Sequence, residues 1–193
     1  AAIYAILGMK QAFSGQYIVQ DDARQHVFWM MRFVDRELFP NDFIANYFQS
    51  IAPAGYSTLY KIAATIGIHP LLFHKILPLF LGLISTYYCF GICLEIFPVP
   101  MTGFIASLLL NQHMWMTDDL ASATARAFIY PIFLAFLYYL LRRSLLPCLS
   151  AIALIGLFYP PYALVGAGVL AKPFGRLLLG QRHKRGQVAV FRR

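Results

Sequence analysis

Two pairs of adjacent aspartates are the residues of this chain best suited to chemistry. Asp21-Asp22 begin a polar stretch that continues to Pro40, and Asp118-Asp119 form a second pair far along the chain. A carboxylate near a membrane surface can act as a general base toward a hydroxyl group, and a second carboxylate can hold a divalent cation against a phosphate leaving group. Mg²⁺ and Mn²⁺ prefer such oxygen ligands. The alternative is that each pair only caps the helix that follows it.

Two further residues accompany the second pair. Arg126 follows Asp119 by about two helical turns, in the outer part of the next apolar segment. An arginine at that depth is unfavourable unless it is paired, so a carboxylate or a phosphate is its expected partner, with snorkelling to the interface as the alternative. His113 precedes the second pair and is either a metal ligand, a proton carrier or simply an interfacial residue.

The composition indicates a membrane protein. The chain has 193 residues, of which 60% are hydrophobic and only 12% charged, and these values predict about five or six spans of roughly 20 residues each. The net charge of +8 is concentrated at the ends of apolar runs, because seven of the sixteen Lys and Arg residues follow Ala171 and Arg142-Arg143 close another run. Such clusters are typical of positive-inside topology, so no nucleic-acid partner is expected. Cys89, Cys93 and Cys148 lack zinc-site spacing and are predicted to be buried thiols.

An all-α fold is predicted, with the spans arranged as a polytopic transmembrane bundle. Residues 1–8 are interpreted as the end of a helix whose beginning is missing, which suggests a fragment. An amphipathic surface helix over 21–38 is predicted in a long first outer loop, from the apolar row Val27, Met30, Met31, Val34 and Leu38. Trp29 and Phe33 are its predicted interfacial anchors. A short helix over 57–66 and further apolar segments are expected at 70–97, 101–115, 123–141 and 145–171. The last is either one kinked crossing or a hairpin, and the basic residues at both of its ends favour the hairpin.

The charges also predict an orientation. Residues 1–171 form the predicted transmembrane domain, and residues 172–193 a basic cytoplasmic segment. If Arg142-Arg143 and this segment lie inside, counting the spans backwards puts both aspartate pairs on the non-cytoplasmic face of the plasma (inner) membrane.

This arrangement resembles the GT-C superfamily, polytopic glycosyltransferases that take sugars from polyprenyl-phosphate or polyprenyl-diphosphate donors. The matching stretches are Asp21-Asp22-Ala23-Arg24, the segment to Pro40, and Thr117-Asp118-Asp119 with Arg126. The segment 20–42 and the Phe158-Tyr159-Pro160-Pro161 turn also resemble uncharacterised bacterial, especially cyanobacterial, membrane proteins. By position, the resemblance implies Asp21 or Asp22 as catalytic base. It implies a second acidic site at Asp118 or Asp119 that binds a metal, with His113 nearby, or orients the acceptor, and Arg126 and Arg24 as substrate-binding residues. The family has more spans than this chain offers, so the fragment by itself is expected to lack part of the donor site.

Two other functions fit parts of the sequence. Broken helices such as 145–171, and prolines within spans, suit a transporter subunit. A non-catalytic membrane assembly protein would use the aspartates only as helix caps. The distinction depends on whether the two acidic pairs converge on one cavity at the outer face.

Overall fold

A computed structural model describes residues 1–171 apart from 11, 16, 19 and 20, and apart from the side chains of Asp21, Asp118 and Asp119. The predicted cytoplasmic segment 172–193 lies outside the described residues. The described chain is all-α, as predicted, and contains no strand. The elements are α1 (Ala2–Met9), η1 (Ala12–Ser14), α2 (Asp21–His26), η2 (Phe28–Phe33), α3 (Phe43–Ile51), α4 (Ala54–Thr65), α5 (Pro70–Ile96), α6 (Pro100–Met116), α7 (Asp118–Ala121), η3 (Ala125–Phe128), α8 (Ile129–Leu141), α9 (Leu145–Phe158) and a helix over Pro160–Ala171.

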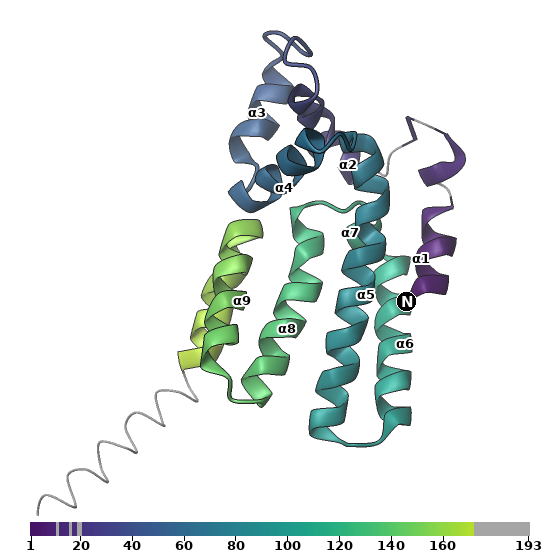
Figure 1. The fold of residues 1–193 in the computed structure, drawn as a ribbon, viewed down its shortest axis with the longest axis vertical. Coiled ribbons are helices and arrows are strands. Elements are labelled where there is room, and N and C mark those ends of the chain that lie inside the picture. The colour runs from purple at the N-terminus through teal and green to yellow at the C-terminus, as the bar shows by residue number, and fades with distance from the viewer. Residues whose placement is uncertain (11, 16, 19–20, 172–193) are drawn as a thin grey trace, which may run out of the picture.

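The long helix α5 is the axis of the molecule. It packs against α6 on one side and α8 on the other, and α8 packs against α9 (Figure 1). Proline occupies the first turn of both α5 and α6, where its missing N–H has no helical partner to lose. An ion pair links Glu95, near the end of α5, to Arg142, just after α8, with 3.4 Å between carboxylate and guanidinium.

The helices α2, α3 and α4, together with η2, form a cap over one end of the bundle (Figure 1). The α5–α6 turn and the α8–α9 turn lie at the opposite end. Asp22 and the backbone of α7 therefore lie at the cap end, and Arg142 and Arg143 lie at the other.

The segment 145–171 is a hairpin. A Cβ placed on Gly156 would lie 3.6 Å from the Cβ of Ala163, and one placed on Gly166 would lie 3.1 Å from Ile152. These pairings run in opposite chain directions, which a single kinked crossing cannot produce. The expected hairpin is therefore confirmed.

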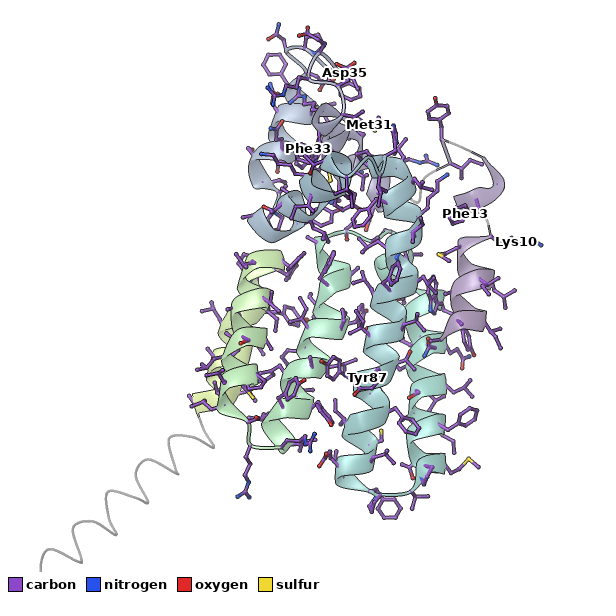
Figure 2. The ribbon with its side chains drawn as sticks, in the orientation of Figure 1. Lys10, Phe13, Met31, Phe33, Asp35 and Tyr87 are labelled. Carbon is purple, nitrogen blue, oxygen red and sulfur yellow. The ribbon has the colours of Figure 1, made fainter. Side chains whose placement is uncertain are left out.

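Among the described helices, α5 alone is long and apolar enough to cross a membrane. Only 28% of its most apolar stretch is buried, which is unlike the core helix of a water-soluble protein, and its outward surface includes Phe80, Ile84 and Tyr87 (Tyr87 is labelled in Figure 2). The apolar helices Ala125–Leu141, Leu145–Phe158 and Pro160–Ala171 are shorter, at 10–17 residues. At 1.5 Å per residue they fall below the roughly 30 Å of a bilayer core.

The predicted amphipathic surface helix over 21–38 is wrong. The segment forms the short helix α2, then the 3₁₀ helix η2, and then an irregular loop. Val27, Trp29 and Met30 are 0–1% exposed and belong to the core between the cap and α5, so Trp29 is not an interfacial anchor. A 3₁₀ helix eclipses residues i and i+3, which aligns Val27 with Met30 on the buried side. Protein therefore covers Val27 and Met30 of the predicted apolar row, whereas Val34 of the same row is 54% exposed.

Arg32 folds the loop after η2 back onto α3. Its guanidinium donates to the backbone carbonyls of Leu38 (3.3 Å) and Phe39 (2.6 Å) and to the side chains of Asn46 (2.9 Å) and Gln49 (2.7 Å). The helix α3, which the hydrophobic pattern did not predict, is capped at its N-terminus by Asp42, whose carboxylate accepts from the backbone N–H groups of residues 44 and 45.

We expect Arg32→Ala to release this loop and to lower the free energy of unfolding by about 2 kcal/mol, the scale of one or two hydrogen bonds to a charged group. Arg32→Lys should recover little, because an ammonium cannot span four acceptors in different directions. Faster hydrogen exchange at residues 34–46 measures the release. Arg36→Ala, which removes the same charge from an exposed neighbour, is the control. Equal exchange in the Arg32 and Arg36 variants would contradict the role of the guanidinium.

Candidate functional site

A pocket of about 360 Å³ lies where the cap meets the bundle. Four separate parts of the chain supply its walls: α2, the corner between α3 and α4, the start of η3, and the turn after α9. The lining residues are Asp22, His26, Ile51, Ala52, Pro53, Tyr56, Thr124, Ala125, Arg126 and Tyr159.

The orientation of α2 puts two ionisable groups into this pocket. Ala23 and Val27 are fully buried and hold one side of the helix against the core. Asp22 directly precedes Ala23, and His26 directly precedes Val27. Asp22 and His26 are therefore also four positions apart on one side of the helix, and both line the pocket. The i, i+4 spacing therefore places a carboxylate and an imidazole on the same wall.

The imidazole of His26 lies half-buried against the ring of Phe48, with 5.2 Å between ring centroids and an edge-on angle of 79°. Burial lowers the pKa of His26 below its usual value of 6.5, and the nearby charge of Asp22 acts in the opposite, weaker direction. The pocket thus favours a neutral imidazole at neutral pH.

This pKa shift predicts a pH dependence of stability. The folded state binds the His26 proton less readily than the unfolded state, so the free energy of unfolding should fall as the pH drops below about 6.5 and through the lowered folded-state pKa. His26→Gln should remove this part of the dependence and leave the remainder. Chemical unfolding of both proteins at pH 8 and pH 5 measures the difference. An identical pH dependence of stability in the two proteins would mean that folding does not lower the pKa of His26.

Two tyrosines, Tyr56 and Tyr159, line the pocket. Tyr56 is 1% exposed and packs edge-on against Tyr60, with 5.0 Å between ring centroids. Burial raises the pKa of Tyr56, so the phenol remains a neutral donor. Tyr159 is held in place by the stack of Phe158 on Phe128, whose ring centroids are 4.2 Å apart and whose planes differ by 20°.

Arg126 brings a cation to the same pocket. It is exposed and lies in η3, shortly after Thr124, which is 7% exposed. Asp22 and Arg126 are far apart in sequence, and the fold brings both to one cavity. A pocket with a carboxylate, a guanidinium and hydroxyl donors is suited to an anionic, hydroxyl-rich ligand.

The other predicted site residues are distributed differently. Arg24 and His113 are exposed and are not among the lining residues. The side chains of Asp21, Asp118 and Asp119 lie outside the described part of the structure, so their predicted roles stay predictions. The backbone of Asp118-Asp119 begins α7, at the cap end of α6.

Among the side chains that the structure describes, no group of three or more His, Cys, Asp or Glu residues is placed to hold a metal ion. Of the predicted ligands only His113 has a described side chain, and one exposed imidazole does not make a metal site. The predicted Mg²⁺ or Mn²⁺ site therefore stays a prediction.

Sequence reasoning missed His26, Tyr56, Thr124 and Tyr159 as pocket residues. The i, i+4 spacing of Asp22 and His26 was available as a signal. Nothing in the sequence indicated that the turn after α9 would return to the cap.

The chain was compared with protein-family models, with curated proteins and with solved structures, and none of them matches.

Proposed function

We propose that this chain is a membrane glycosyltransferase of the GT-C type, which moves a sugar from a polyprenyl-phosphate-linked donor to an acceptor hydroxyl. In this proposal the chain is polytopic in the plasma (inner) membrane, and the cap lies on the non-cytoplasmic face. The observation that supports it best is the shared pocket of Asp22 and Arg126 at the cap end of the bundle.

The proposed chemistry uses these two groups on opposite sides of one bond. Asp22 takes the proton of the acceptor hydroxyl, and the acceptor oxygen forms a bond to the anomeric carbon of the sugar. The bond from that carbon to the phosphate oxygen breaks, and the polyprenyl phosphate leaves with the electron pair. Arg126 stabilises the negative charge of the leaving phosphate. Tyr159, which lines the pocket, offers an aromatic surface for the sugar ring.

The phosphate half of this proposal can be tested without knowing the sugar, because a polyprenyl-phosphate sugar donor releases polyprenyl phosphate whichever sugar it carries. The full chain in nanodiscs is titrated with polyprenyl monophosphate and with the methyl ether of the same polyprenol. We expect the phosphate to bind more tightly, and Arg126→Gln to weaken it by about tenfold or more, the effect of losing one charge-assisted hydrogen bond. The methyl ether should bind both proteins equally.

The matched control is Arg143→Gln, which removes the same charge at the opposite end of the bundle. It should leave the affinity for the phosphate unchanged. Equal losses of affinity in the Arg126 and Arg143 variants would show that the phosphate responds to the overall charge of the protein and not to Arg126. An unchanged affinity in the Arg126 variant would overturn the assignment.

One observation favours the alternative of a transporter subunit. His74 and Lys75 are 1% and 5% exposed within α5, the candidate span, and ionisable groups at such positions commonly serve transport. The Lys75 ammonium, however, donates to the carbonyl of Gly15 at 2.6 Å, a contact that fixes residues 12–15 against α5. Lys75→Met in proteoliposomes distinguishes the two functions. Loss of solute flux with intact polyprenyl-phosphate binding would favour the transporter.

A further inference from the structure

The wall that α2 contributes to the pocket between cap and bundle bears on a point that the proposed function leaves open, the kind of acceptor. Asp22 and His26 both line this pocket, Asp22 with an exposed and His26 with a half-buried side chain. Side chains four positions apart on a helix have Cβ atoms about 5–6 Å from each other, and the charge of Asp22 acts on the imidazole of His26. One small ligand can therefore contact both groups at once.

Aromatic rings hold the imidazole of His26 in a fixed direction. It meets Phe48 of α3 edge-on, and Phe48 in turn packs edge-on against Phe28, with 6.4 Å between the ring centroids of the two phenylalanines. Phe28 packs against the core that the cap shares with α5. A side chain that is already ordered in the free protein loses little conformational entropy when it binds a ligand, so His26 is well prepared for recognition.

The charge state of His26 determines what it can recognise. Because burial holds the pKa of His26 below its usual value of 6.5, against the weaker opposing effect of Asp22, the imidazole is neutral at neutral pH. A charged imidazolium would pair with Asp22 and weaken this carboxylate as a base, which a neutral imidazole does not. A neutral imidazole offers one nitrogen that donates and one that accepts a hydrogen bond. A hydroxyl group, which also donates and accepts, is the partner that suits it.

The size and the other walls of the pocket indicate which molecule supplies this second hydroxyl. The volume of about 360 Å³ lies near the lower end of the roughly 300–1,000 Å³ typical of ligand pockets, so the pocket suits one small group such as a sugar residue. Its lining also includes the ring of Tyr159 and the apolar Ile51 and Pro53. A sugar ring has surfaces that match, with hydroxyls on adjacent carbons along its edge and C–H groups on its faces. A monohydric alcohol would engage Asp22 and leave His26 unused.

We infer that the acceptor is a saccharide whose reacting hydroxyl has a second hydroxyl on the adjacent carbon. Asp22 takes the proton of the first hydroxyl, and the imidazole of His26 hydrogen-bonds the second. His26 moves no proton, and the bonds that form and break are those of the proposed transfer. It is a specificity-determining residue that orients the correct acceptor against Asp22. This inference rests on the proposed function, and the test below separates the failure of one from the failure of the other.

The test compares two acceptors that differ by one hydroxyl group, cyclohexanol and trans-1,2-cyclohexanediol. The full chain in proteoliposomes is supplied at pH 8 with polyprenyl-phosphate glucose, mannose and galactose in turn, and kcat/KM for each acceptor is measured from formation of the glycoside. We expect the diol to be favoured by about tenfold, the effect of one additional hydrogen bond to a half-buried group. A diol favoured only by the statistical advantage of two hydroxyls over one would overturn the inference and leave the proposed function standing. No transfer to the diol, to the alcohol or to a methyl glycoside would overturn both.

Two substitutions of His26 separate recognition from packing. His26→Phe keeps an aromatic ring against Phe48 but has no ring nitrogen, so it should reduce the preference for the diol to the statistical advantage. His26→Gln keeps a donor and an acceptor and should retain most of the preference. Polyprenyl-phosphate binding, which depends on Arg126, verifies that both variants are folded.

The matched control is Gln25→Phe, which places the same ring at the exposed neighbouring position of α2 that does not line the pocket. It should leave the preference for the diol at the wild-type value. A wild-type preference in the His26→Phe protein would show that the imidazole serves only to pack against Phe48, and the inference would be wrong.

Discussion

Replacing Asp22 by asparagine is expected to lower sugar transfer by a factor of about 10² to 10⁴ while the protein remains folded. The asparagine side chain has nearly the same shape but cannot accept the proton of the acceptor hydroxyl. Asp22 is exposed to the pocket and is not part of the core, so its substitution should change the unfolding free energy little. The assay follows release of polyprenyl phosphate from polyprenyl-phosphate glucose, mannose and galactose, each offered in turn to proteoliposomes together with a free sugar as the hydroxyl-bearing acceptor.

The matched control is Asp35→Asn, which removes the same charge from an exposed acid at the far tip of the cap (labelled in Figure 2). It should retain full activity. Binding of polyprenyl phosphate should also persist in the Asp22 variant, because Arg126 is intact. Activity of the Asp22 variant at the level of the Asp35 variant would rule out Asp22 as the base and leave the predicted role of Asp21 to be tested in the same assay.

The bundle was predictable from the sequence because its helix boundaries are marked by strong local signals. Pro70 and Pro100 stand at the first turns of α5 and α6, and Arg142-Arg143 follow the end of α8. Between these signals the chain is almost continuously apolar over lengths that favour helices. The predicted helix over 57–66 is likewise present as part of α4, although it begins earlier, at Ala54.

The cap was not predictable in the same way. Its apolar residues occur at helical spacing, and that spacing does not reveal whether lipid or protein covers them. The η2 segment was assigned to a membrane surface, although Trp29 and Met30 belong to the core that the cap shares with α5. The helix α3 was missed although a local signal marks its start, because Asp42 is an N-cap whose carboxylate accepts from the backbone N–H groups of residues 44 and 45.

The difference between local sequence signals and contacts made only in the fold also explains which site residues were predicted. Asp22 and Arg126 are charged residues in an apolar sequence, so their types alone identified them as unusual. Tyr56 and Tyr159 belong to a chain with 12 tyrosines, and only the meeting of α4 with the turn after α9 gives these two a place in the pocket. Polar outliers can therefore be identified from the sequence, whereas the aromatic walls around them require the fold.

The contact between α4 and the end of α9 depends on Gly55, and Gly55→Ala is expected to lower the free energy of unfolding by about 1–3 kcal/mol. A Cβ at this position would lie 2.9 Å from the carbonyl oxygen of Leu157 and 3.0 Å from its Cβ, so α4 and α9 would have to move apart. Because Pro53 and Tyr56 line the pocket on one side of this contact and Tyr159 on the other, the separation should also weaken polyprenyl-phosphate binding.

Gly156→Ala is the matched control on the facing helix. Its new Cβ would meet Ala163 at 3.6 Å, an ordinary contact, and replacing a helical glycine should stabilise the protein by up to about 1 kcal/mol. Urea unfolding and polyprenyl-phosphate titration of both variants measure the two effects. If both variants were equally stable and bound equally well, α4 and α9 would not be in close contact, and the pocket that unites Asp22, Arg126 and Tyr159 would lose its structural basis.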